Sequence, residues 1–149
     1  MALRHYGFSA HAVSVLLDDG LEILGEDECR RLVAGVTFGR VGVTMGALPA
    51  IFPVNYAVVD GQIVFRTGEG TKLRAALDRA VVAFEVDHPG TDAQRGWSVL
   101  IVGMARELDV ANYGASAHLL VGASPVASRD HLVQIRPEFI SGRRVARCV

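Results

Sequence analysis

The sequence predicts a mainly β protein: a small antiparallel barrel of five or six strands with three short helices. Its 149 residues suit one domain with a substantial core. Segments with the alternating period of strands outnumber helical segments and do not alternate with them, which argues against a Rossmann-type sheet. Asp60-Gly61, placed between two β-branched runs, is a strong signal for a hairpin turn.

The N-terminal part of the chain contains one predicted helix. The first residues show no consistent period, so residues 1–24 are assigned to an N-terminal arm that precedes a domain spanning residues 25–149. Acidic residues at the start of the next periodic segment, and Gly35 after it, predict a short helix over Glu26–Ala34.

Three strands are expected to follow this helix. The first begins at Arg40, where valines alternate with smaller residues. The second covers Ala50–Val59 and contains Pro53, which cannot donate to a ladder and so indicates an edge or a bulge. The third strand is Gln62–Thr67, beyond the predicted hairpin turn.

The second half of the chain alternates less regularly. The apolar segment Ala80–Val86 predicts a strand buried on both faces. Gly96–Leu108 predicts a long strand, in which Gly103 indicates a bend or bulge. The other predicted elements are a helix at Thr71–Leu77, a loop at Asp87–Arg95, a helix at Asn112–Val121, and strands at His131–Arg136 and Phe139–Val145.

A two-glycine turn between the third strand and the next helix has the residues of an anion site. It holds Thr67, Thr71 and Lys72. Glycines let backbone N–H groups approach an anion, hydroxyls and an ammonium neutralise it, and the first helical turn offers unpaired donors. The alternative is that Lys72 is an exposed helix-start residue, while Thr67 lies in a turn and Thr71 caps the helix.

Composition limits the classes of function. Half of the residues are hydrophobic, which a subunit interface or a large core would explain, and the formal net charge is −1. This charge gives no electrostatic basis for nucleic-acid binding. Cys29, Cys148 and the five histidines show no metal-ligand spacing, so no metal site is expected. No apolar h-region follows a basic start, and no apolar run is long enough to cross a bilayer, so we expect a soluble cytoplasmic protein without a membrane partner.

Six segments occur together in the order found in one family. The chain resembles the split-barrel flavoproteins of the pyridoxamine 5′-phosphate oxidase-like superfamily, in particular its small bacterial branch, which is related to nitroimidazole-resistance reductases. The resemblance covers residues 25–145. The matching segments are Gly39-Arg40-Val41, Phe52-Pro53-Val54-Asn55-Tyr56, residues 65–73, residues 82–87, Gly96-Trp97-Ser98-Val99 and Gly142-Arg143-Arg144.

This resemblance implies a six-stranded antiparallel split β-barrel with a few short helices. It also implies an FMN-binding homodimer with one flavin in each of two clefts between the subunits. Four groups of residues are implied in the cofactor site: Thr67, Thr71 and Lys72 at the flavin phosphate; Phe52, Pro53, Val54 and Asn55 along the isoalloxazine ring; Phe65 and Arg66 on the strand beside it; and Trp97 and Ser98 reaching the flavin of the partner subunit.

Two of these residues keep an alternative role. Asn55 is either a bulge residue that satisfies backbone groups or a hydrogen-bond partner of the flavin edge. Trp97 either packs in an interface or contacts the flavin. Glu85 and Asp87, at a strand end, are expected to be surface or ion-paired carboxylates in preference to catalytic acids or bases.

Two departures from the family pattern bear on function. The oxidases proper carry two adjacent basic residues at the phosphate, whereas here Leu73 follows Lys72, with Arg66 as a candidate to compensate. The chain also lacks their longer C-terminal segment, so its substrate is expected to differ from pyridoxamine 5′-phosphate. The predicted function is an FMN-dependent oxidoreductase acting on a small planar substrate at a dimer-interface cleft, with no catalytic residue assigned. The alternative is a non-catalytic protein that binds or senses flavin, deazaflavin coenzyme or haem.

Overall fold

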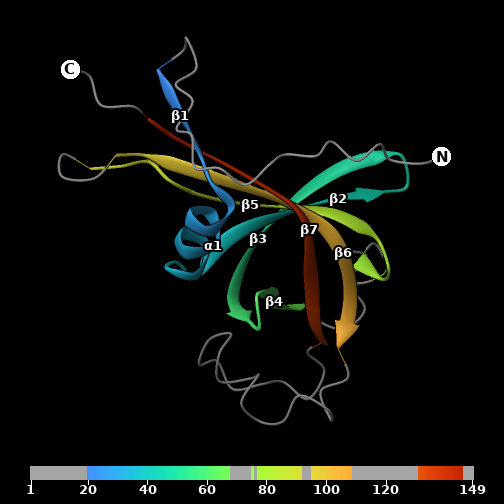
Figure 1. The fold of residues 1–149 in the computed structure, drawn as a ribbon. Helices are drawn as coiled ribbons and strands as arrows, with labels where there is room; N and C mark the ends of the chain where they lie inside the picture. The colour runs from blue at the N-terminus through green and yellow to red at the C-terminus, as the bar shows by residue number, and fades with distance from the viewer. Residues whose placement is uncertain (1–19, 68–74, 76, 92–94, 109–130, 146–149) are drawn as a thin grey trace.

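Seven strands and one helix form the described part of the chain, which in this computed structural model comprises residues 20–67, 75, 77–91, 95–108 and 131–145 (Figure 1). Of the predicted helix Thr71–Leu77 only Ala75 and Leu77 are described, both of them helical, and the predicted helix Asn112–Val121 lies outside these residues. In chain order the elements are β1 (Leu21–Leu24), α1 (Glu26–Ala34), β2 (Phe38–Met45), β3 (Leu48–Val59), β4 (Gln62–Thr67), β5 (Val81–His88), β6 (Trp97–Leu108) and β7 (His131–Val145).

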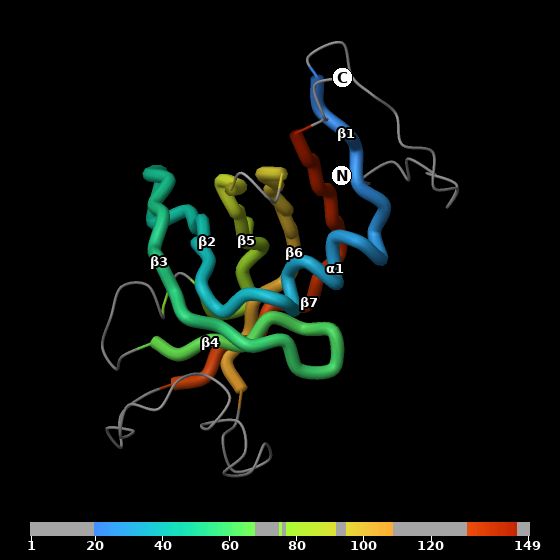
Figure 2. Tube along the Cα trace, turned by 90° about the vertical axis from the view of Figure 1, so that its left-hand side faces the viewer, coloured from blue at the N-terminus to red at the C-terminus, as the bar shows by residue number. Residues whose placement is uncertain are grey.

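Six of the strands close into a barrel. The sheet order is β1-β7-β4-β3-β2-β5-β6, and β6 also pairs with β7, so the ring from β7 to β6 has no open end. All pairs are antiparallel. Figure 2 shows β3, β2, β5 and β6 side by side, with β4 crossing below them. The predicted six-stranded antiparallel barrel is therefore confirmed.

Strand β1 lies outside the ring and was not predicted. Its four residues pair with the last part of β7, from Leu21 opposite Val145 to Leu24 opposite Gly142. A four-residue strand has too few alternations to give a clear pattern, and this one depends on a partner at the other end of the chain. The predicted domain boundary after residue 24 stays a prediction.

Strand β7 is continuous where two separate strands were predicted. A register shift allows it to pass Pro137, because Val102 of β6 faces Phe139 whereas Gly103 faces Pro137. A Cβ atom on Gly103 would overlap the carbonyl oxygen of Arg136, so only glycine allows the two strands to approach here. The bulge predicted at Gly103 is confirmed.

Strand β5 corrects one expectation, since it is buried on one face and not on both. Its side chains alternate, with Val82, Phe84 and Val86 buried and Val81 61% exposed. Among the described residues no element covers the outer face of the barrel at β5. For this reason only the inner face of the strand is buried, although its composition is apolar.

Helix α1 has the predicted bounds and packs its apolar side into the barrel core. Cys29, Leu32 and Val33 are buried there. The Tyr56 hydroxyl of β3 donates to the Val33 carbonyl oxygen at 2.6 Å, and its ring meets Phe84 edge-on at 4.9 Å between centroids. The C-terminal end of α1 is thereby fixed to the sheet. Within the described residues, no helix has the length and apolar character needed to cross a bilayer.

Candidate functional site

Strands β3 and β4 separate at the place where the sequence predicts a cofactor. Their ladder runs from Val59 opposite Gln62 to Tyr56 opposite Phe65, and it ends there. Asn55 and Arg66 are the first residues beyond the ladder. The predicted ring strand, residues 52–55, and the predicted residues 65–67 of β4 therefore lie on the two sides of this separation.

The ring strand divides its side chains between the two faces of the sheet. Val54 is buried and Phe52 is half-buried against the core, whereas Pro53 and Asn55 are exposed on the outer face. Phe65 is fully buried in the core. Consequently Val54 and Phe65 can reach a cofactor on the outer face only through their backbone, while Pro53 and Asn55 present side chains to it.

One edge of β3 is open in front of these residues. From Leu48 to Asn55 the strand pairs with β2 on one edge, and no strand among the described residues pairs with the other edge. Because the β2 ladder passes Pro49 and Pro53 without interruption, their nitrogens face the open edge, where no donor is needed. The edge predicted from Pro53 is therefore present, and it leaves backbone groups accessible to a ligand.

The end of β4 holds buried polar atoms without partners. Thr67 is 5% exposed, and its Oγ1 has no hydrogen-bond partner among the described residues. Directly opposite on β7, His131 contacts Glu107 through Nδ1, while its buried Nε2 has no hydrogen-bond partner in the part of the chain that the structure describes. An unsatisfied buried polar group costs about 1–3 kcal/mol, so these atoms fit a polar ligand group.

From the sequence His131 could lie near a cleft or at a surface strand end, and it was not assigned to the cofactor. Arg66 lies beside Thr67 and is half-buried. Thr71 and Lys72, the other two residues predicted at the phosphate, lie outside the described residues.

Trp97 and Ser98 are not brought to this separation within one chain. Trp97 is 6% exposed, belongs to the core of its own barrel and stacks on His88 at 6.3 Å between ring centroids. Ser98 is exposed and pairs with Asp87 of β5 and Arg143 of β7, so β5 and β2 separate it from β3. Contact with the flavin of a partner subunit stays a prediction for both residues.

An ion cluster lies beside the ring strand on the outer face. Arg40, the ladder neighbour of Pro53, donates through Nη1 to Glu85 at 2.9 Å and to Asp87 at 2.7 Å. The hydrogen bonds to Asp87 and Glu85 raise the pKa of the Arg40 guanidinium above its usual value. Both carboxylates are thus ion-paired, as expected. Nowhere in the described part of the chain do three His, Cys, Asp or Glu side chains gather as metal ligands would.

Comparisons with known proteins give a consistent family. Residues 25–144 match the family model described as pyridoxamine 5′-phosphate oxidase. An uncharacterized protein of Mycobacterium tuberculosis is 39% identical over 131 residues, which are 82% of this chain and 84% of that protein.

Solved structures share the fold. The FAD binding protein from Mycobacterium smegmatis is 37% identical with a TM-score of 0.66, over 82% of this chain and 98% of its own. The heme binding protein from the same organism is 16% identical with a TM-score of 0.64, over 76% of this chain and 51% of its own. At that lower identity the likeness shows the fold alone.

Proposed function

The chain belongs to the pyridoxamine 5′-phosphate oxidase family, and from this membership we propose that it binds FMN and acts as an FMN-dependent oxidoreductase on a small planar substrate. One observation carries the proposal: the predicted ring residues on β3, and Arg66 with the predicted phosphate residue Thr67 on β4, flank the point where these strands separate. The likeness to an FAD binding protein at 37% identity supports a flavin in this position.

The end of β4 fits the polar half of such a cofactor. Thr67 shares the inner face of β4 with Phe65, but it is the last residue of the strand, so a cofactor that passes over this end would accept its hydroxyl at the phosphate or the ribityl chain. His131, opposite Thr67 on β7, offers Nε2 at the same end. Thr71 and Lys72 follow in the sequence and would complete the phosphate site.

The chain's own residues orient the ring. Bound FMN supplies hydride transfer between a reduced donor and an acceptor. The exposed amide of Asn55 and the open edge of β3 would hold the polar edge of the ring, while the Pro53 side chain limits its position. Glu85 and Asp87 are both ion-paired with Arg40, and neither is assigned a catalytic role.

A second copy of the chain is proposed to cover the outer face of the barrel. An apolar row crosses five strands, because each residue in it is the ladder partner of the next. Its ends are large and exposed, Ile51 at 71% and Phe139 at 55%, and its centre is small. The row is Ile51, Gly42, Ala83, Val102 and Phe139. Such a surface supports the homodimer whose cleft would complete the cofactor site.

The test begins with the visible spectrum of the freshly purified protein. We expect a flavin spectrum, with the released cofactor identified as FMN and not FAD by chromatography. Anaerobic stopped-flow mixing with NADH or NADPH should then bleach the flavin absorbance. A bound flavin that no nicotinamide donor reduces would overturn the oxidoreductase and leave the flavin site standing.

The second candidate is a binding protein without turnover, holding flavin, deazaflavin coenzyme or haem. The Arg40 cluster favours it, because the two carboxylates beside the ring strand are both ion-paired with Arg40. The same spectrum separates the three ligands at once, since a haem Soret band or a deazaflavin band differs from that of flavin.

A further inference from the structure

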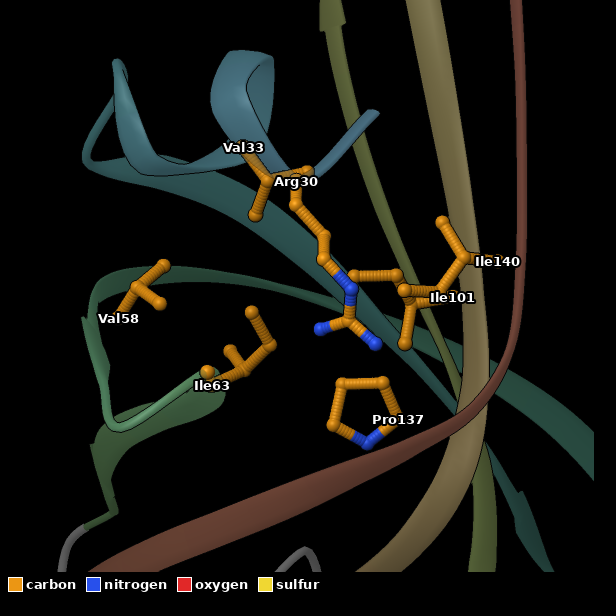
Figure 3. Close-up of a pocket in the computed structure, with 8 residues that line it drawn as sticks. Arg30, Val33, Val58, Ile63, Ile101, Pro137 and Ile140 are labelled. Atoms are coloured by element: carbon orange, nitrogen blue, oxygen red, sulfur yellow. The ribbon is translucent and has the colours of Figure 1, made fainter. Parts of the chain in front are cut away.

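A small apolar cavity opens between α1, the β3–β4 hairpin and the bulged part of β6 and β7 (Figure 3). It shares no residue with the predicted cofactor site. Six apolar side chains line it: Val33, Val58, Ile63, Ile101, Pro137 and Ile140. Three of them, Val33, Ile63 and Ile101, are at most 3% exposed, so the floor of the cavity is the core itself.

One cation borders this apolar space. Arg30 of α1 extends over the cavity, and Figure 3 shows its guanidinium between the helix and Pro137. Glu26, one turn earlier, accepts from Nε at 3.0 Å and from Nη2 at 2.8 Å through the same oxygen. These bonds fix the guanidinium by one edge. The Nη1 group has no partner among the described residues.

The turn beneath the guanidinium keeps this edge open. Gly61 has a φ of 76°, which strongly favours glycine, and a Cβ placed on it would lie 3.8 Å from Nη1 of Arg30. A larger residue at this position would extend toward the free edge of the arginine. The hairpin signal that the sequence gives at residues 60–61 therefore also leaves room at the mouth of the cavity.

We propose that this cavity binds a small monocarboxylate with a compact apolar tail of about four to six carbon atoms. The cavity volume is about 60 Å³. On that measure one water needs about 10–15 Å³, so the cavity accepts roughly four to six groups of that size. The tail occupies the apolar floor, and the carboxylate takes the free edge of Arg30 in the fork geometry that guanidinium groups offer.

The lining selects against other anions. A phosphate or sulfate would place a strongly hydrated charge against apolar walls, which carries a large desolvation cost. The neighbouring Glu26 carboxylate also repels a dianion more than a monoanion. Acetate fits the charge but leaves the apolar floor uncovered.

The test is isothermal titration calorimetry of the full chain, as purified with any bound cofactor, using 3-methylbutanoate. We expect one saturable site per chain, and binding at least tenfold weaker for acetate and for the neutral amide of the same acid. Arg30→Gln should weaken binding about 10- to 100-fold, since a hydrogen bond to a charged group is lost. Arg31→Gln, which changes the next residue on the same helix and lies outside the cavity, should leave binding unchanged.

A second variant addresses the apolar floor. Ile140→Phe fills the cavity from β7 and should abolish binding while Arg30 and its bonds to Glu26 remain. Absence of saturable binding by the parent chain, or equal affinity in Arg30→Gln, would overturn the proposal. Because the cofactor site shares no residue with this cavity, the flavin spectrum recorded in the same samples reports separately on the proposed function.

Discussion

The hydroxyl of Thr67 allows a structural role to be separated from a ligand-binding role. We expect Thr67→Val to weaken FMN binding without destabilising the apoprotein. The two side chains have nearly the same shape, so the change removes one hydroxyl from a residue that is 5% exposed. Since Oγ1 has no hydrogen-bond partner in the described structure, removing it deletes an unsatisfied buried group and no bond.

The two expected effects have opposite signs. The free energy of unfolding of the apoprotein should stay the same or rise by about 1 kcal/mol, because burying an unpaired hydroxyl costs about 1–3 kcal/mol. The affinity for FMN should fall about 10- to 100-fold if the hydroxyl bonds a charged phosphate oxygen. If the hydroxyl instead held the fold together, its removal would lower the free energy of unfolding.

Two measurements on the same preparation test this prediction. Urea unfolding of the apoprotein, followed by circular dichroism, gives the free energy of unfolding, and quenching of FMN fluorescence gives the affinity. Thr37→Val is the matched control, since Thr37 is exposed just before β2. An apoprotein that unfolds more easily and binds FMN as tightly as the parent would refute the reasoning.

Three further outcomes follow from the surface, the helix and the bulge. Ile51→Asp places a charge at one end of the exposed apolar row and should convert a dimer to monomers in light scattering, with loss of bound flavin; a flavin-loaded monomer would contradict the shared cleft. Hydrogen bonds from Arg31 and Arg144 lower the pKa of Glu28 from 4.5 to about 2, so its stabilisation is present above pH 4.5 and is lost as the pH falls toward 2. Because solvent screens this partly exposed site, the ion pairs of Glu28 contribute about 1 kcal/mol to the free energy of unfolding. Glu28→Gln should therefore lower the free energy of urea unfolding by that amount at pH 7 but not at pH 2. Gly103→Ala forces a Cβ into a β7 carbonyl and should lower the free energy of unfolding by about 1–3 kcal/mol, whereas unchanged urea unfolding would mean that the strands move apart freely.

Short sequence patterns correctly predicted the helix and the hairpin, which depend on residues close together in the chain. Helix α1 follows from acids at its start and a glycine after its end, and the hairpin follows from Asp60-Gly61, both of which have positive φ. The closure of β6 on β7 and the pairing of β1 with β7 join residues far apart in sequence, and no short pattern encodes such a partner.

The candidate site was predictable only in part for a similar reason. The order of segments pointed to residues 52–55 and 65–67, and the structure places both at the separation of β3 and β4. His131 enters through the β4–β7 register, which the sequence does not contain. The burial of Trp97 in its own core likewise depends on how the barrel closes, since a tryptophan beside a glycine suits either a core or an interface.

The bulge at Gly103 gives one more prediction, because it shapes the carboxylate cavity. Gly103 allows β7 to approach β6 at Pro137, and beyond the shift Ile140 faces Ile101. Pro137, Ile140 and Ile101 all line the cavity, so Gly103→Ala should weaken 3-methylbutanoate binding at least tenfold in the folded variant, although position 103 is not in the lining. Thr67→Val, at the other site, should leave this affinity unchanged. Calorimetry on both variants, with folding checked by circular dichroism, tests whether the bulge shapes the site; parental affinity in Gly103→Ala would contradict a role for the bulge.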